Sequence, residues 1–200
     1  MSRRLALTSA ALVAVVLAFV AAIVANAWPH AAAEISRERS PLAWLSSTLL
    51  VASAAVALAV GLRERERPAF WALAAGLFAL ALDERFMFHE RLKALVLRRV
   101  FDYDRAAMGI WGDLPMALIP LAGAWVLWSL RAELWRRSCR PWILAAFALG
   151  AVAIALDIAT EAALVQVAEE LLETAAETAM LIALLAVAEA KLRGAEVTRG

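Results

Sequence analysis

Apolar residues along this chain come in long runs separated by short charged stretches, a pattern typical of helices that cross a membrane. Several runs approach the length of about 20 residues that spans a hydrocarbon core of about 30 Å. We therefore expect an all-α fold, a polytopic transmembrane helical bundle of about six spans. It forms a single integral membrane domain over residues 1–200. The expected spans cover residues 5–27, 42–62, 69–90, 108–130, 142–162 and 168–190.

The positions of Lys and Arg predict which span ends face the cytoplasm, because short cytoplasmic loops carry an excess of basic residues. Basic residues precede the first span and follow the second, fourth and sixth spans, so both termini are expected in the cytoplasm. The protein is then expected to be a multi-pass membrane protein. The basic residues assigned to the cytoplasmic side are Arg3, Arg4, Arg63, Arg65, Arg67, Arg131, Arg136, Arg137, Arg140, Lys191, Arg193 and Arg199.

The first span also imitates a cleavable signal peptide, since Arg3 and Arg4 precede an apolar run that ends in Ala25-Asn26-Ala27. The run from Leu5 to Ala25 is longer than a usual signal core. We therefore favour a retained helix over cleavage, which would leave five spans.

The last two spans have no Gly or Pro between Gly150 and Gly194 to mark the turn between them. An unbroken helix from Trp142 to Leu192 would be about 75 Å long, more than twice the hydrocarbon thickness. A reversal is therefore expected near residues 162–167.

Composition narrows the possible functions. Hydrophobic residues make up 64% of the chain, and the formal net charge is +1. No basic block is interleaved with aromatic residues, so a nucleic-acid partner is not expected. Cys139 is the single cysteine and cannot form an internal disulfide. The chain has no serine nucleophile motif, glycine-rich phosphate loop or haem-attachment motif.

Ten of the nineteen acidic residues fall near the expected outer ends of four spans, although the topology was derived from Lys and Arg alone. A carboxylate at the centre of a membrane helix costs about 2.5 to 3.5 kcal/mol, and less near the interface. Such residues normally face a protein interior, a partner charge, a metal or water. We expect them to share one pocket with His89. The ten are Asp83, Glu84, Glu90, Asp113, Asp157, Glu161, Glu169, Glu170, Glu173 and Glu177.

Helical spacing predicts which acids share a face, because each residue advances about 100°. In a third span that continues to residue 90, Asp83 and Glu90 lie on one face, with Glu84 or His89 at its flank. Three further acids descend into the membrane on one face of the sixth span, with Glu177 deepest.

Many carboxylates with one imidazole suit a divalent metal ion, although the sequence does not distinguish Zn, Mn, Fe, Mg or Ca. The only other histidine is His30. If the protein is an enzyme, a metal-activated water would attack a lipid or lipid-linked substrate, with Asp83 or Glu161 as proton acceptor. The candidate metal ligands are Glu84, His89, Glu90, Asp113, Asp157, Glu170, Glu173 and Glu177.

Three alternatives remain open. Arg85, Arg91 and Lys93 could neutralise part of the cluster as an ion-pair network, although three cations cannot match ten acids. The acids could form a proton relay in a proton- or ion-coupled transporter, although the cytoplasmic halves of the spans are almost devoid of polar residues. The chain could also be a non-catalytic membrane subunit of a larger complex, since its Ala-rich faces suit helix packing.

Two motifs resemble those of a family of uncharacterised bacterial multispanning membrane proteins. The first runs from Asp83 to Glu90 in the pattern Asp-Glu-x4-His-Glu, and the second runs from Glu169 to Glu173 in the pattern Glu-Glu-x2-Glu. Phe86-Met87-Phe88 is bulkier than the small residues typical of the first motif, and would narrow a cavity there. The resemblance implies no activity, but it does imply a role for Asp83, Glu84, His89, Glu90, Glu170 and Glu173.

Overall fold

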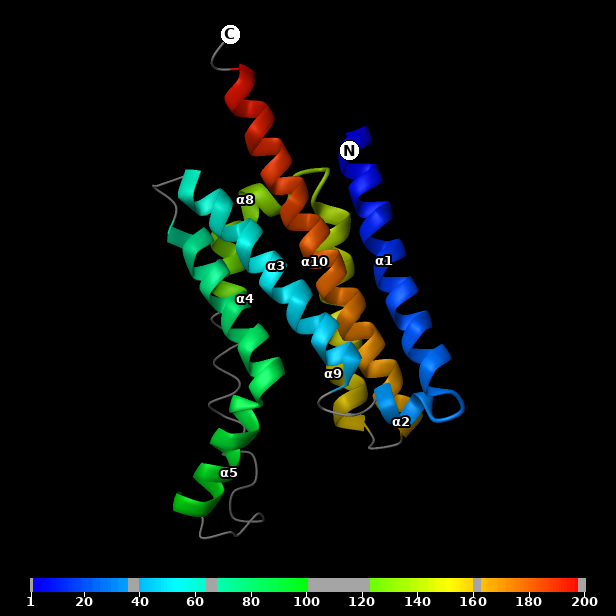
Figure 1. Ribbon diagram of the computed structural model, residues 1–200. Helices are drawn as coiled ribbons and strands as arrows, with labels where there is room; N and C mark the ends of the chain where they lie inside the picture. The colour runs from blue at the N-terminus through cyan, green and yellow to red at the C-terminus, as the bar shows by residue number, and fades with distance from the viewer. Residues whose placement is uncertain (1, 36–39, 64–67, 101–122, 160–162, 198–200) are drawn as a thin grey trace.

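The computed structural model describes residues 2–35, 40–63, 68–100, 123–159 and 163–197, which form helices and turns without a strand (Figure 1). This confirms the all-α prediction. Residues 123–129 are also helical. The remaining helices are α1 (Arg3–Ala27), α2 (Ala31–Ile35), α3 (Pro41–Arg63), α4 (Pro68–Phe86), α5 (Phe88–Val100), α8 (Arg131–Leu134), α9 (Arg140–Ala159) and α10 (Ala163–Val197).

Local sequence signals set the starts of the long helices. The Ser2 side chain accepts a hydrogen bond of 3.0 Å from the Leu5 amide, which satisfies a donor in the first turn of α1. Ser40 does the same for α3 through the Ala43 amide, also at 3.0 Å. Helices α3 and α4 each begin with a proline, whose missing N–H is not needed at that position.

Within the described residues, three helices are long and apolar enough to cross a membrane: α1, α3 and the Leu164–Arg193 part of α10. The apolar stretch of α9, Arg140–Leu156, is shorter. The structure therefore supports a membrane protein, but it does not clearly give the six expected spans. Most of the expected span 108–130 lies outside the described residues.

Helix α10 is the central helix of the bundle. It packs lengthwise against α9 and α3, and α3 in turn packs against α4. The main core joins α3, α4 and α10 to the segment from Val126 to Ile143. Helix α1 is attached more sparsely, through Leu5, Val16 and Ile23 on one face. Its other side chains are largely exposed, as expected for a helix that faces lipid.

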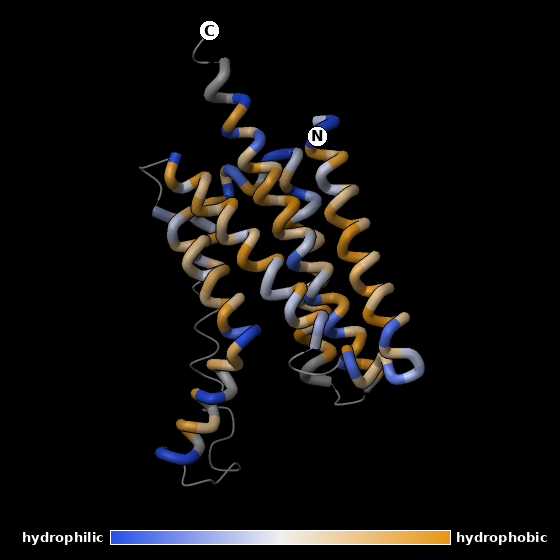
Figure 2. The backbone as a smooth tube through the Cα atoms, in the orientation of Figure 1, coloured by the Kyte–Doolittle hydropathy of each residue, from blue (hydrophilic) through white to orange (hydrophobic). Residues whose placement is uncertain are grey.

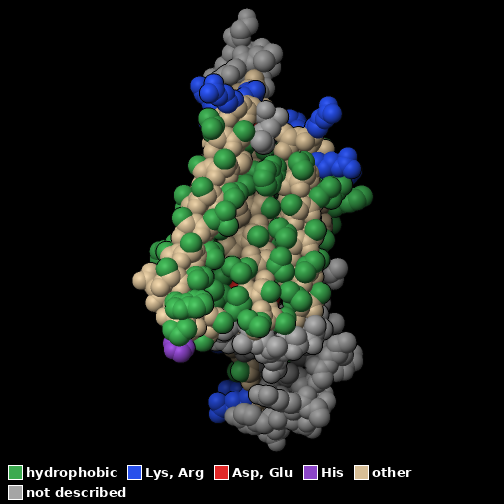
Figure 3. Space-filling model, turned by 90° about the vertical axis from the view of Figure 1, so that its right-hand side faces the viewer, with side chains coloured by type: hydrophobic (Ala, Val, Ile, Leu, Met, Phe, Trp, Pro, Cys, Tyr) green, Lys and Arg blue, Asp and Glu red, His purple; other side chains and the backbone are tan. Residues whose placement is uncertain are grey.

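The two ends of the bundle are named here after the short helices that lie at them. The start of α1 and the end of α10 lie at one end together with α8, here called the α8 end (Figure 1). Helix α2 and the start of α10 lie at the opposite end, here called the α2 end. Hydrophobic residues predominate in the middle of the helices, and hydrophilic residues are more frequent toward their ends (Figure 2). The side surface is covered with hydrophobic side chains, with Lys and Arg above and below them (Figure 3).

The expected third span, 69–90, is interrupted at Met87. Its φ of 54° lies in the left-handed region, which costs an L residue about 1 to 2 kcal/mol. The Met87 amide still donates to the Asp83 carbonyl at 2.6 Å, but regular helix stops at Phe86. Helix α5 then leads away from the bundle (Figure 1).

The reversal before the last helix comes slightly earlier than expected. Helix α9 ends at Ala159 and α10 begins at Ala163, so the connection falls on residues 160–162, outside the described residues. The 35 residues of α10 exceed the about 20 needed to cross the hydrocarbon core, so α10 extends beyond a single span.

Candidate functional site

A hydrogen bond between two helices marks the candidate site. Ser46 on α3 is buried, and its hydroxyl oxygen lies 2.6 Å from each carboxylate oxygen of Glu177 on α10. Glu177 is partly buried. A polar group in an apolar interior is costly unless it finds such a partner. The hydroxyl therefore fixes the deepest acid of α10 against α3.

Glutamates from two helices lie close enough to interact electrostatically with Glu177. They are Glu170 and Glu173 on α10 and Glu84 at the end of α4. Glu170 interacts in turn with Glu173, Glu84 and Glu169. We call Glu84, Glu170, Glu173 and Glu177 the carboxylate cluster. All four side chains are partly buried.

Helical spacing on α10 explains how three members of the cluster come together. Glu170, Glu173 and Glu177 are three, four and seven residues apart, which places them on one side of the helix. Thr174 and Thr178 are buried within the same stretch. Their hydroxyls donate to the backbone carbonyls of Glu170 and Thr174, at 2.9 and 2.8 Å. Both threonine hydroxyls therefore have hydrogen-bond acceptors within α10 itself.

The predicted site residues differ in how far the structure describes them. Asp83 and Glu84 lie at the end of α4, where both are partly buried. His89 and Glu90 belong to α5 and Asp157 to α9, but their side chains lie outside the described residues. Asp113 and Glu161 lie outside the described residues altogether.

The break at Met87 changes the expected geometry of the first motif. A spacing of seven residues aligns Asp83 with Glu90 only if one regular helix contains both, and here α4 ends before α5 begins. The structure places Glu84, which was expected only at the flank, near enough to Glu170 and Glu177 to interact with them electrostatically. The two halves of the motif therefore belong to separate helices.

The donor chemistry of the cluster suits a cation, but the described residues do not by themselves form a metal centre. Carboxylate and hydroxyl oxygens are ligands for Ca²⁺, Mg²⁺ and Mn²⁺. Among the side chains that the structure describes, no three of His, Cys, Asp and Glu converge closely enough to hold a metal ion. His30 is exposed in the turn between α1 and α2.

Ser46 is the member of the site that the sequence analysis missed. Small hydroxyl residues are common in membrane helices, where they usually bond to their own backbone. The available signal was position: Ser46 and Ser53 are seven residues apart, and both are buried on one face of α3. Spacing alone does not identify the serine that contacts a neighbouring helix, because the Ser53 hydroxyl forms no hydrogen bond with the described residues.

Comparison with known proteins assigns the family but no activity. No curated protein and no solved structure gives a significant match to this chain. A family model does match, over residues 5–188, which include α3, α4, α9 and most of α1 and α10. The chain therefore belongs to the family described as a domain of unknown function, DUF8692.

Proposed function

We propose that this chain is a multi-pass integral membrane protein whose carboxylate cluster binds a divalent metal ion on the extracytoplasmic side. The observation that carries the proposal is the electrostatic interaction of Glu84 with Glu170 and Glu177, in a site that Ser46 helps to hold together. Like charges in an apolar setting repel one another unless they share protons or a cation. A divalent metal ion would compensate two of these charges at once.

The proposed topology has six spans with both termini in the cytoplasm of a bacterial inner membrane. Helices α4 and α9 lie alongside the three long apolar helices and would add two spans. The expected span 108–130, most of which lies outside the described residues, would be the sixth. The α8 end carries Arg3, Arg131 and Lys191 and would face the cytoplasm. Helix α1 would be retained rather than cleaved, because Leu5, Val16 and Ile23 pack against the bundle.

A complete metal site would need ligands beyond the cluster. His89, Glu90, Asp113 and Asp157 remain the proposed additional ligands, and their side chains lie outside the described residues. Hydrolysis or oxidation of a lipid-like substrate would depend on this larger set. The identity of the metal and the class of substrate depend on this larger set of ligands. Metal binding by the cluster itself can be tested directly at Glu84 and Glu177.

The test is elemental analysis of the purified full-length protein after equilibration with Mg²⁺, Ca²⁺, Mn²⁺, Fe²⁺ or Zn²⁺. We expect a stoichiometric metal in the wild type and a clear loss in Glu84→Gln and Glu177→Gln. Glu189→Gln is the matched control, because Glu189 is a glutamate of the same helix that contacts Ser2 and Arg193 instead of the cluster.

Two results would contradict the metal proposal. One is a wild type without stoichiometric metal under all five conditions. The other is equal metal loss in Glu189→Gln, which would indicate nonspecific binding. Metal binding should also raise the melting temperature, and the rise should continue with the logarithm of the metal concentration above Kd, since a ligand that binds only the folded state stabilises it.

The transporter alternative has less support along α10. The residues from Ala179 to Ala188 are all apolar and lie between the cluster and Glu189, so no polar path continues along α10.

The alternative of a non-catalytic subunit rests on α1, whose Leu7 and Leu17 are more than 60% exposed. Copurification of a stoichiometric membrane partner from the native host, lost on substitution of these two leucines, would favour that alternative.

A further inference from the structure

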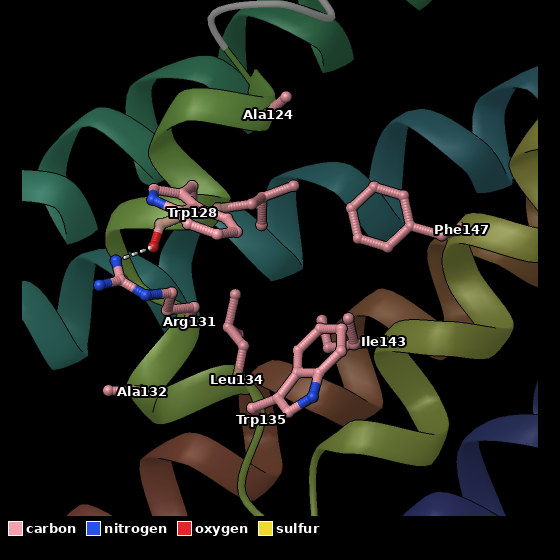
Figure 4. A pocket seen from close by; sticks show the side chains of 9 residues that line it. Ala124, Trp128, Arg131, Ala132, Leu134, Trp135, Ile143 and Phe147 are labelled. Atoms are coloured by element: carbon pink, nitrogen blue, oxygen red, sulfur yellow. Dashed lines mark hydrogen bonds between the residues drawn. The ribbon is translucent and has the colours of Figure 1, made fainter.

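A cavity of about 590 Å³, shown in Figure 4, lies beside α8. The carboxylate cluster lies toward the opposite end of the bundle, near the start of α10. It is formed between the segment that leads into α8 and the first turns of α9. Its lining is apolar apart from one side chain, Arg131. Leu127, Trp128, Trp135, Ile143 and Phe147 are the large apolar residues at opposite sides of the lining, and Phe147 points across the space toward Trp128 (Figure 4).

The guanidinium of Arg131 is held at the rim of this cavity. It donates to the Trp128 carbonyl at 3.0 Å and lies 4.8 Å from the centroid of the Trp128 ring. A guanidinium has five N–H donors, so most of them remain available to a ligand. Among the described residues, no carboxylate pairs with Arg131. Glu133, on the same short helix, is buried and pairs with Lys191, whose Nζ atom lies 3.9 Å from the Glu133 Oε1 atom.

The exposure of the lining places the cavity at the surface of the bundle. Trp128, Trp135 and Phe147 are 67%, 54% and 49% exposed. Tryptophans of membrane proteins concentrate at the level of the lipid headgroups, with hydrocarbon on one side and water on the other. The cavity therefore opens where an acyl chain and a headgroup are both within reach.

Electrostatics select the kind of headgroup. Arg136, Arg137 and Arg140 are exposed within a few residues of Arg131, and the Arg140 guanidinium lies 5.9 Å from the Trp135 ring centroid. Such a group of arginines attracts anionic lipids. Arginine also binds phosphate oxygens with favourable geometry.

We propose that this cavity binds an anionic phospholipid from the leaflet at the α8 end. One acyl chain lies between Trp128 and Phe147, and the phosphate accepts hydrogen bonds from Arg131. The apolar lining suits an alkyl chain, and the volume lies within the range of ligand pockets, about 300 to 1,000 Å³. The site is separate from the carboxylate cluster and does not depend on metal binding there.

The test is native mass spectrometry of the delipidated full-length protein, titrated with phosphatidylglycerol or with phosphatidylcholine of the same chains. We expect tighter binding of phosphatidylglycerol by the wild type. Arg131→Gln should weaken that binding about tenfold, as expected for the loss of a charge-assisted hydrogen bond. Arg137→Gln is the matched comparison: it removes one charge from the same group of arginines, but Arg137 does not line the cavity, so this variant should weaken binding less than Arg131→Gln.

A second variant tests the acyl-chain half of the site. Ala124→Trp adds bulk to the lining without changing charge, and should weaken binding of both lipids. Equal affinities of wild type and Arg131→Gln for phosphatidylglycerol would overturn the proposal. So would an equal loss in Arg137→Gln, or unchanged binding by Ala124→Trp. Circular dichroism and size-exclusion profiles identify a variant that does not fold, in which case the other variant decides.

Discussion

The hydroxyl of Ser46 on α3 bridges to both carboxylate oxygens of Glu177 on α10, with 2.6 Å to each. This contact joins residues 131 positions apart and links the central helix to its neighbour at the level of the carboxylate cluster. It is both a packing contact between helices and a constraint on the site, since it limits where the Glu177 side chain can lie. Its energetic contribution can be measured.

We predict that Ser46→Ala lowers the free energy of unfolding by about 1 kcal/mol, within the range for hydrogen bonds between membrane helices. The measurement is reversible unfolding in mixed micelles of detergent and SDS. Ser47→Ala is the control, because the Ser47 hydroxyl donates to the Ala43 carbonyl of its own helix at 3.0 Å. In a Glu177→Gln background, Ser46→Ala should cost less. Equal effects of the Ser46 and Ser47 substitutions would contradict the prediction.

Most of the helices could be predicted from the sequence because membrane thickness and hydropathy determine them together. Pro41 and Pro68 coincide with the starts of α3 and α4, within one residue of the expected spans. The glutamates of α10 were also predictable as a group, since spacing alone places Glu170, Glu173 and Glu177 on one side.

The two features that were not predicted have local physical reasons. Phe86-Met87-Phe88 contains no Gly or Pro, so nothing in the sequence marks the left-handed residue that ends α4. The role of Ser46 was hidden by its chemistry. Ser47 and Thr48 beside it donate to carbonyls of their own helix, and only the three-dimensional packing of α3 on α10 separates them from Ser46.

We predict that substitutions of Met87 follow the preference of each residue for positive φ. Met87→Gly should raise the free energy of unfolding by up to about 1 kcal/mol, because glycine adopts this conformation without steric cost. Met87→Val should lower it, since a β-branched residue is least compatible with it. Equal stability of the Gly and Val variants in the same unfolding assay would indicate that residue 87 has an ordinary helical conformation.

The close approach of α3 and α4 at Gly61 leads to a packing prediction. A Cβ atom at residue 61 would lie 3.2 Å from the Phe70 Cβ atom, whereas one at residue 76 would meet nothing within 4 Å. Gly61→Leu should therefore lower the free energy of unfolding by about 1 to 3 kcal/mol through overpacking. Gly76→Leu should be neutral or stabilising, as for glycine replacement in an open helix position. The reverse order would contradict this account of the helix interface.

Two cations near the end of α10 should differ in their contribution to stability. Lys191 pairs with Glu133, which is only 3% exposed, whereas Arg193 pairs with Glu189 and is itself 60% exposed. Lys191→Met should lower the free energy of unfolding by about 2 to 3 kcal/mol, because it removes a compensating charge from a buried carboxylate. Arg193→Met should change it by less than about 0.5 kcal/mol. Similar losses in the two variants would contradict the distinction.

The single cysteine provides a test of packing at the α8 end. Cys139 is fully buried, and burial raises the pKa of its thiol above the usual value, despite smaller opposing effects from Ser138 and Arg136. The thiolate is the reactive form, so a raised pKa leaves less of it at any pH below that value. We predict that a maleimide leaves the folded protein unmodified at neutral pH and modifies it after unfolding in SDS. Reactivity of the folded protein should increase only as the pH rises beyond the ordinary thiol range.

The control places a cysteine two residues away, in the double variant Arg137→Cys and Cys139→Ala. Residue 137 is exposed, so its thiol should react rapidly with the same reagent in the folded protein. If wild-type Cys139 reacts as fast as this control, then the segment between α8 and α9 does not pack as described.

With a membrane-impermeant maleimide, the double variant also reports the side of the membrane on which residue 137 lies. Because we expect the α8 end in the cytoplasm, residue 137 should be labelled in inverted membrane vesicles and protected in intact spheroplasts. The opposite labelling pattern would place the carboxylate cluster on the cytoplasmic side and contradict the proposed location of the site.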